Sequence, residues 1–345
     1  ANTPGLCDQE NRRTFWKLQR NVIEQVVEAG ESFVVMSFSP GRRPGMGLQL
    51  RLLEPEHLAW VMQINPDNGN EVRGGVEVDR YGAAVAYWFY LSESMYRPRL
   101  EPTRITADRV CHVFDPRRAS QNRGVTWFHP VLRKLWDLGK YDAYQLQAAR
   151  IEACMAAAIT GANPDASGSG VPTINPPGTD PTTDQAGNRY ADFEGGMIFE
   201  GAPGDQIQLL KPERPGALYQ PFVQQNLRAV AAGVRQSYET VARDYTGGSY
   251  SSLRQSLLED RREYSCIQAD ISLMLCQPVW ERFLFWAVLE GAVQAPGYSD
   301  NPQPWQYAKW HTQGFEWIDA RAESEAYMNA IKYGLKTREQ IIAGT

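Results

Sequence analysis

The most constraining feature of this sequence is a helical pattern over residues 130–160, with Pro130 placed in its first turn. Apolar residues recur at helical spacing along this stretch, from Leu132 to Ile159. At about 1.5 Å per residue, such a helix would span roughly 46 Å, well beyond the usual globular helix. It therefore needs neighbours along its whole length, supplied either by its own chain or by copies of itself.

Two further helical patterns follow, over residues 218–244 and residues 251–289. The run Tyr-Thr-Gly-Gly-Ser at 245–249 interrupts the chain between them. Pro278 is expected to kink or split the later helix, because proline cannot donate the backbone hydrogen bond of a helix interior.

A different composition separates the first two helical patterns. Residues 161–192 contain five glycines and five prolines in 32 positions and almost no large apolar side chain, which favours a mobile loop. Short strands at 193–200 and 206–210 would close it. Near the C-terminus, residues 320–343 predict a pair of helices, and Thr337 with Gln340 has the spacing of a capping box.

The N-terminal part of the chain is rich in strand patterns. Residues 8–31 predict a helix that Gly30 ends. Alternation of apolar and polar residues then predicts strands over 32–38 and 48–52 and a hairpin of 76–79 and 85–90 turned at 80–82. A further strand is predicted over 105–114, around a corner at Asp108 and Arg109. The chain is therefore expected to be of the α+β class.

Charge and composition exclude several classes of protein. The formal net charge of −5 argues against a protein that grips nucleic acid through its phosphates. The longest apolar run, residues 283–289, is far too short to span a membrane, and no signal peptide is visible at the N-terminus. The five cysteines are scattered and odd in number, which favours reduced thiols in a protein made inside a cell.

No constellation for catalysis or metal binding emerges from the sequence. A phosphate-binding P-loop is absent, and the Gly-x-Gly runs at 45–47 and 168–170 lack the flanking pattern of a dinucleotide or hydrolase site. His112 and His129 are interpreted as structural hydrogen-bonding residues. The acidic cluster of Glu259, Asp260 and Glu263 is interpreted as a solvated or subunit-facing surface, because Arg261 and Arg262 interrupt it. We therefore predict no enzyme, no metal and no cofactor.

Several runs resemble the lambda-type portal proteins of tailed bacteriophages, and they occur in order along almost the whole chain. They include VEVDRYGAAVAYWFY at 76–90, KYDAYQLQAARI at 140–151, DYTGGSYSSLR at 244–254 and LLEDRR at 257–262. Others of this kind lie at 105–114, 123–132, 211–216, 317–319 and 334–340. Residues 161–192 match no such pattern.

The resemblance implies a ring, usually of twelve subunits, at one vertex of the phage head, through which double-stranded DNA is packaged and ejected. It also implies a portal fold divided along the chain. The divisions are a β-rich wing at 1–125, stem helices at 126–160 and 217–243, a clip at 161–216, a tunnel loop at 244–252, a long wing helix at 253–316 and the start of a crown at 317–345.

The resemblance further assigns candidate residues and partners. The tunnel loop would face DNA through Asp244, Tyr245, Thr246, Gly247, Gly248, Ser249, Tyr250, Ser251 and Ser252. Four arginines of the stem, Arg133, Arg150, Arg228 and Arg235, would line the channel or contact neighbouring subunits. The implied partners are copies of the chain, DNA in passage, the terminase large subunit, the major capsid protein and head–tail connector or adaptor proteins, with no membrane.

The expected location is the portal vertex of the virion, after assembly in the host cytoplasm. The family normally has a substantial segment before the point where this chain begins, so a longer native N-terminus, and a longer C-terminal tail, are expected. Two readings remain open beside the portal. One is a non-channel helical scaffold or adaptor of the virion, in which Gly247 and Gly248 only cap a helix. The other is an enzyme whose site the sequence does not reveal.

Overall fold

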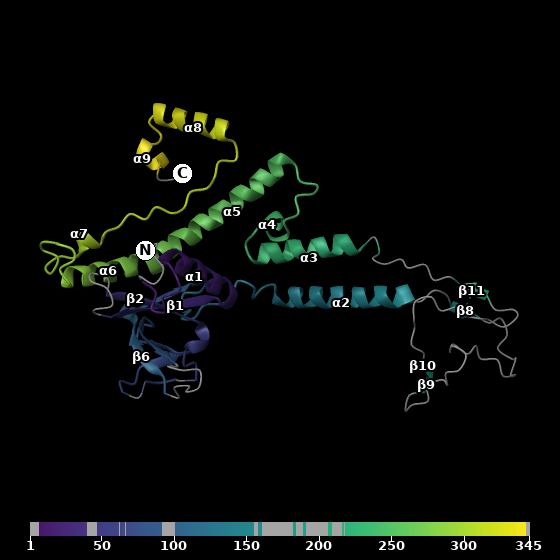
Figure 1. Ribbon diagram of the computed structural model, residues 1–345, viewed down its shortest axis with the longest axis horizontal. Coiled ribbons are helices and arrows are strands. Elements are labelled where there is room, and N and C mark those ends of the chain that lie inside the picture. The colour runs from purple at the N-terminus through teal and green to yellow at the C-terminus, as the bar shows by residue number, and fades with distance from the viewer. Residues whose placement is uncertain are drawn as a thin grey trace. The chain divides into compact units, whose positions relative to one another are not determined.

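The structure is a computed structural model that describes residues 7–39, 47–61, 63–65, 67–91, 101–154, 158–160, 182–183, 189–190, 206–208, 216 and 218–342. The chain divides into two compact units (Figure 1). The first, called the sheet unit, comprises Ala1–Pro130 and Ala231–Thr345, and the second, called the helix-pair unit, comprises Val131–Val230. Each unit is described by itself.

The first helix of the sheet unit, α1 (Phe15–Ala29), is shorter than the predicted 8–31. Its start is delayed because Asp8 pairs with Leu50 in a β-bridge, while its carboxylate accepts the backbone N–H groups of Arg12 and Arg13. Gly30 ends the helix as predicted, with φ at +95°. Only glycine fits there, because a Cβ would also collide with the backbone of Val125.

A three-stranded antiparallel sheet in the order β2-β1-β7 follows α1. Its strands are β1 (Glu31–Phe38), β2 (Leu48–Leu53) and β7 (Val110–Phe114). One face packs on α1, where Leu18 and Val22 are fully buried against Leu50. This face forms the main core of the unit.

A second antiparallel sheet has the order β3-β4-β5-β6. Its strands are β3 (Glu71–Arg73), β4 (Val76–Val78), β5 (Ala84–Phe89) and β6 (Thr103–Thr106). The β4–β5 hairpin and its turn confirm the prediction. The strand predicted over 105–114 is two strands, β6 and β7, and the corner predicted at Asp108 and Arg109 lies where they divide. A 3₁₀ turn at Ala107–Arg109 passes the chain from β6 to β7 in the other sheet. Strand alternation alone could not show this change of sheet.

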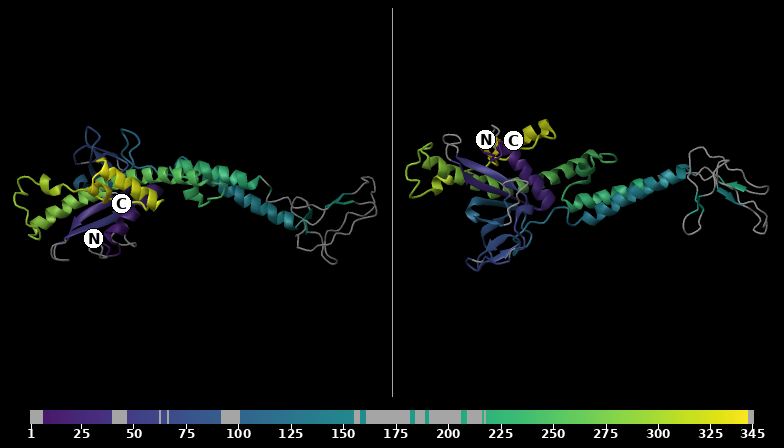
Figure 2. Two further views of the ribbon diagram at one scale, coloured as in Figure 1. Left: turned by 90° about the horizontal axis from the view of Figure 1, so that it is seen from above. Right: turned by 60° about the horizontal axis from the view of Figure 1, so that its bottom comes forward.

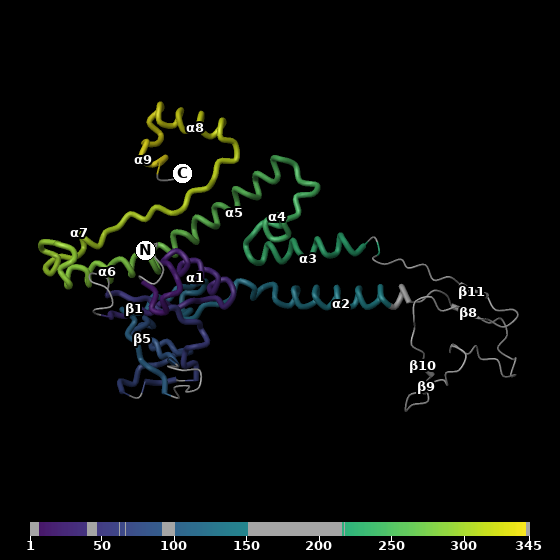
Figure 3. The backbone as a smooth tube through the Cα atoms, in the orientation of Figure 1, coloured from purple at the N-terminus to yellow at the C-terminus, as the bar shows by residue number. Residues whose placement is uncertain are grey.

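The long helical pattern over 251–289 is interrupted where Pro278 predicted it. Helix α5 (Tyr250–Ile271) passes into a π-helical turn at Ser272–Cys276, and α6 (Gln277–Leu289) continues from there. Pro278 lies in the first turn of α6, where its missing N–H is tolerated. Leu275 and Cys276 of the π turn are buried in the same core as α1. Figure 3 follows this path as a continuous tube.

The C-terminal part contains α7 (Gln303–Gln306), α8 (Ala320–Lys332) and α9 (Arg338–Ile342). The predicted capping box is present, with the Gln340 N–H donating to Thr337 Oγ1 at 3.2 Å and the Thr337 N–H donating to Gln340 Oε1 at 3.0 Å. Between α7 and α8 an extended segment runs along α5, where Arg261 donates to the Glu316 carbonyl and Gln268 donates to the Gln313 carbonyl.

The helix-pair unit contains α2 (Leu132–Cys154) and α3 (Tyr219–Gly233), which lie side by side in both Figure 1 and Figure 2. Tyr141 of α2 stacks on Tyr219 and contacts Phe222, and the Tyr219 hydroxyl donates to Asp142. These contacts hold the two helices together.

Both helices are shorter than predicted. The pattern over 130–160 does not stay helical to its end, because β8 (Ala158–Thr160) pairs with β11 (Gln206–Gln208). The second pattern breaks at Arg235, whose φ is +58°. A helical residue cannot adopt that conformation, so α3 ends at Gly233 and the short helix α4 (Tyr238–Ala242) follows.

Inside the proline- and glycine-rich region, β9 (Thr182–Thr183) pairs with β10 (Arg189–Tyr190). Strand β11 confirms part of the strand predicted at 206–210. The rest of the predicted loop over 161–192 and the strand predicted at 193–200 lie outside the described residues.

Candidate functional site

The break between α4 and α5 is built around Asp244. Arg243 ends α4 in the left-handed conformation, with φ at +52°. The Asp244 carboxylate then accepts the Thr246 backbone N–H at 3.0 Å and the Thr246 hydroxyl at 2.6 Å, and it accepts the Tyr238 hydroxyl from α4 at 2.7 Å. One side chain therefore organises the turn and ties it to the preceding helix.

The two glycines of this break are needed for different reasons. Gly247 has φ at +76°, where a side chain would be strained even though no atom lies within 4 Å of a Cβ placed there. Gly248 has an ordinary φ, but its Cβ would lie 2.7 Å from Leu253 Cδ2. Gly247 is therefore needed for its positive φ, and Gly248 is needed because the Leu253 side chain occupies the place of a Cβ.

The predicted tunnel loop over 244–252 is longer than the observed break. Ser249 is the N-cap of α5, accepting the Ser252 N–H at 3.2 Å, so Tyr250, Ser251 and Ser252 form the first helical turn. We use the name DNA-loop candidate for residues 243–249. Tyr245 in it and Tyr250 beside it are both largely exposed. No lysine or arginine occurs from 244 to 252, although Arg243 lies at the base.

The four candidate arginines are not equivalent. Arg133 and Arg150 lie on α2 and Arg228 on α3, all exposed within the helix-pair unit. Arg235 lies outside α2 and α3, and its guanidinium pairs with Glu263 at 3.1 Å and with Asp115 at 3.2 Å, both in its own chain. That Arg235 lines the channel or contacts a neighbouring subunit stays a prediction.

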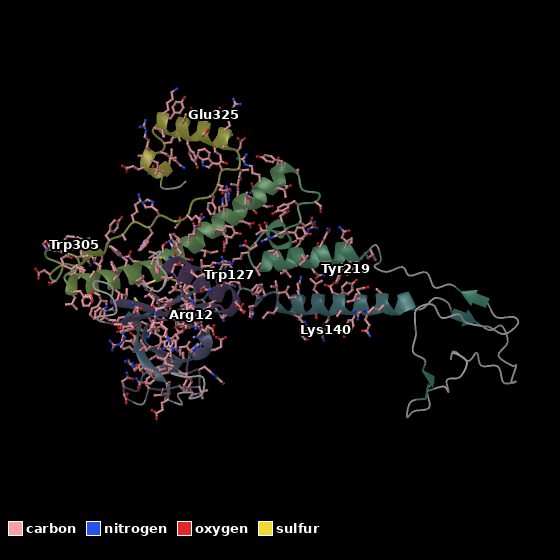
Figure 4. All side chains as sticks on the ribbon, viewed as in Figure 1. Arg12, Trp127, Lys140, Tyr219, Trp305 and Glu325 are labelled. Carbon is pink, nitrogen blue, oxygen red and sulfur yellow. The ribbon has the colours of Figure 1, made fainter. Side chains whose placement is uncertain are left out.

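Helix α2 exposes an apolar ridge. Leu132, Trp136 and Tyr144 follow at multiples of four residues, and Lys140 completes the series with its Nζ 4.7 Å from the Trp136 ring centroid. Trp136 is 64% exposed. Figure 4 labels Lys140 on α2 and Tyr219 on α3. Ridges of this spacing pack into the groove of another helix, so this face is shaped for a helical neighbour.

Asp260 is the residue that sequence reasoning missed. It was interpreted as part of a solvated acidic cluster, but it is only 4% exposed. Its carboxylate accepts the Ser237 N–H, the Ser237 hydroxyl and the Thr240 hydroxyl, all from the start of α4. The sequence could identify Ser237 as a helix N-cap, but it could not reveal a partner on α5 that lies 23 residues further on.

Two buried glutamates in the sheets hold the strongest electrostatic networks. Glu77 accepts hydrogen bonds from Arg104 and Trp88, and from three asparagines of the preceding loop, Asn65, Asn68 and Asn70. The Arg104 guanidinium, helped by the asparagines, holds the pKa of Glu77 far below its usual range. We interpret this network as structural, since every donor comes from the same sheet region.

Glu31 is the centre of the second network. Burial alone would raise its pKa, but hydrogen bonds from His112, Arg123 and the Gly124 N–H outweigh burial and lower it. Burial lowers the pKa of His112, against the pull of Glu31. The ring of His112 stacks between Phe33 and Phe114. This confirms that His112 is a structural hydrogen-bonding residue.

The cysteines and other titratable groups offer no alternative centre in the described part of the chain. Cys7, Cys111, Cys266 and Cys276 are free thiols, and burial raises the pKa of Cys111 to about 12 and that of Cys276 to about 11. Among the described residues, no three His, Cys, Asp or Glu side chains are grouped to hold a metal ion. The helices described there also include none with the length and apolarity to cross a bilayer.

Solved structures with a similar chain are distant. One chain from "Virion of native gene transfer agent (GTA) particle" is 13% identical, with a TM-score of 0.47, over 94% of this chain and 78% of its own. Another, from "Neck of empty GTA particle computed with C6 symmetry", is 13% identical, with a TM-score of 0.42, over 87% of this chain and 79% of its own.

Sequence comparison is far more specific. The "Probable portal protein" of Halomonas phage phiHAP-1 is 29% identical over 95% of this chain and 62% of its own length. "Portal protein B" of Escherichia phage lambda is 26% identical over 96% of this chain and 66% of its own length. The chain thus spans a little under two thirds of the length of these relatives. The family described as "Phage portal protein, lambda family" matches residues 1–268. The chain therefore belongs to the lambda family of phage portal proteins and is a component of the virion.

Proposed function

We propose that this chain assembles into a ring at one vertex of a phage head, and that double-stranded DNA is packaged and ejected through that ring. The observation that carries the proposal is the exposed ridge of Leu132, Trp136, Lys140 and Tyr144 on α2. Large apolar side chains left in water on a helix favour burial against another helix. A neighbouring copy of the same chain supplies one.

The portal divisions are part of the proposal. The sheet unit would supply the wing, α2 and α3 the stem, and residues 161–216 a clip that docks the terminase large subunit and later the head–tail connector proteins. Residues 317–345 would begin the crown, and the wing would contact the major capsid protein. Twelve subunits is the number that the family resemblance favours.

The charge of the DNA-loop candidate supports passage of DNA rather than retention. A protein that contacts six to ten phosphates loses about 10³–10⁵ in affinity between 50 and 200 mM salt, which reflects strong ionic holding. The loop offers DNA Tyr245 and small hydroxyl side chains, with Tyr250 beside it and its one cation, Arg243, at its base. Such a surface touches DNA without anchoring it. The alternative hypothesis, a scaffold without a channel, gives no reason for a loop of this composition.

Particle counting tests the ring. Mass photometry and electron microscopy of the purified chain should show closed rings with one rotational symmetry. A chain that stays monomeric under all assembly conditions, including in its full-length form, contradicts the proposal and favours the scaffold or adaptor.

The double substitution Gly247→Ala with Gly248→Ala tests the loop. Alanine at a positive φ costs about 1–2 kcal/mol, and a Cβ at position 248 meets Leu253, so the loop must change shape. We expect rings to form and nuclease-protected DNA per particle to fall several-fold. The matched control is Gly139→Ala on α2, where a Cβ meets nothing within 4 Å. Equal DNA content in both variants would remove the DNA-facing role of the loop.

A further inference from the structure

The segment between α3 and the DNA-loop candidate is fastened to α5 by one buried carboxylate. Asp260 lies on α5 and accepts the Ser237 N–H at 2.8 Å, the Ser237 hydroxyl at 2.6 Å and the Thr240 hydroxyl at 2.6 Å. Hydrogen bonds to an ionised oxygen at such short lengths are the strong kind. We call these three residues the α4 clamp.

The other attachments of this segment are weaker or more exposed. Arg235 pairs with Glu263 and Asp115, but its side chain is 43% exposed, and exposed pairs contribute little. The Tyr264 hydroxyl also donates to Gln236 Oε1 at 2.5 Å. The α4 clamp is the attachment with a buried charge, and a buried carboxylate that loses its donors is costly. The clamp is therefore the attachment whose loss would cost this segment most.

Helix α4 depends on this attachment. It has only five residues, Tyr238–Ala242, and a helix of that length does not hold itself in water. Both of its ends carry left-handed residues that are not glycine, Arg235 at +58° and Arg243 at +52°. In the described part of the chain, Asn11 is the only other non-glycine residue with a positive φ. Strained residues of this kind persist only while their surroundings hold them, so they are placed as hinges on either side of α4.

Release of the clamp would change the reach of the loop. When α4 is held on α5, the loop that is not attached to either helix comprises the seven residues 243–249. Its tip can extend at most about 12 Å from its base. With α4 released, the excursion begins after Gly233 and comprises residues 234–249, whose tip would reach about 27 Å. One contact thus separates two loop lengths.

We propose that Asp260 is a positioning residue that sets the reach of the DNA-loop candidate, by holding α4 on α5 or letting it go. The inference rests on the proposed function, since it assigns the loop to DNA in the channel. It adds that the movable element is α4 together with the loop, and not the glycine pair alone.

Hydrogen–deuterium exchange on assembled, full-chain particles tests the clamp without DNA. Asp260→Ala removes all three hydrogen bonds, and we expect amide exchange in residues 234–243 to rise at least about a hundredfold. Exchange in the sheets and in α6 should stay unchanged. The matched control is Glu259→Ala. Glu259 is an exposed acid on the same helix and accepts a hydrogen bond from Gln255, so its loss should leave amide exchange in residues 234–243 as in the unaltered chain.

Thr240→Val keeps the test decisive if the Asp260 variant does not assemble. It removes one hydroxyl donor at nearly constant volume, and exchange in residues 234–243 should rise about tenfold. Unchanged exchange in the assembled clamp variants would overturn the inference.

Nuclease-protected DNA per particle provides the functional arm. We expect Asp260→Ala to lower it and Glu259→Ala to leave it unchanged. If Asp260→Ala loosens residues 234–243 without altering packaged DNA, while the Gly247 and Gly248 substitutions lower it, the clamp has no role in passage and the proposed function stands. If none of these variants alters packaged DNA, the DNA-facing role of the loop fails, and the role of the clamp fails with it.

Discussion

Two large aromatic side chains, one in the sheet unit and one in the helix-pair unit, lie in opposite environments. Phe89 on β5 is fully buried and packs edge-on against Phe33, with ring centroids 5.4 Å apart. Trp136 on α2 lies mostly in water. The core around Phe89 is closed within one chain, whereas the ridge on α2 leaves apolar area in water. We propose that a neighbouring copy of the chain covers this ridge.

Charged groups follow the same division. In the sheets, Glu31 and Glu77 are buried and surrounded by donors from their own chain. On the helix pair, Arg133 and Arg150 point into solvent. Buried charges with complete sets of partners fix one arrangement of the sheets, while exposed charges leave the helices free to adapt to a neighbour.

The largest effect in this comparison is expected at Phe89. Phe89→Ala leaves a cavity in the second sheet, and it should lower the free energy of unfolding by about 3–5 kcal/mol. Urea unfolding followed by tryptophan fluorescence measures the change. A loss below 1 kcal/mol would mean that the sheets do not fold as a closed core.

The stability of the sheet unit at low pH gives a second test. Because the folded-state pKa of Glu77 is depressed, its stabilisation is fully present above the ordinary glutamate pKa of about 4.3. It is lost as pH falls below that value. The urea midpoint should therefore drop between pH 5 and pH 3, and the drop should be smaller in Glu77→Gln. Equal slopes in both proteins would show that Glu77 does not couple protonation to folding.

The smallest effect on stability is expected at Trp136. Trp136→Ala should change the free energy of unfolding by less than about 0.5 kcal/mol, because the side chain is already exposed. Ring yield in mass photometry should nevertheless fall. Trp16 on α1, 61% exposed, is the matched control, and Trp16→Ala should leave ring yield unchanged. If both variants assemble equally well, the ridge on α2 is not an assembly surface.

The sequence was most informative where one residue dictates local geometry. Gly30, Pro278 and the Thr337–Gln340 box each determine a helix end or interruption by their own stereochemistry, and all three predictions are confirmed. Alternation likewise predicted the β4–β5 hairpin. The family resemblance, carried by ordered runs of residues, was confirmed over residues 1–268.

Predictions failed where the outcome depends on distant partners. The break at residues 234–237 carries no glycine at its turning residue, Arg235, and its clamp comes from Asp260 on another helix. The change of sheet at Ala107–Arg109 is likewise set by which strands are available for pairing. Within the candidate site, the run at 245–249 with Gly247 and Gly248 predicted a break between two helices, and the structure confirms that break. Its role toward DNA stays a prediction. The start of α5 at Tyr250 depends on the Ser249 cap, which the pattern did not locate.

The π turn at Ser272–Cys276 has a consequence for how this chain tolerates change. Its closing bond runs from the Gln277 N–H to the Ser272 carbonyl, so the turn holds one residue more than an α-helical turn would. That extra residue rotates everything after it by about 100° relative to an unbroken helix. The buried faces of α5 and α6 therefore point in different directions around the common axis. Helix α5 can then hold the segment before the loop, while α6 packs on the core of the sheet unit. Deleting one residue here would remove the phase difference without removing a single core side chain from α6. The number of residues in the π turn, more than their identity, therefore sets the relative orientation of the two helices.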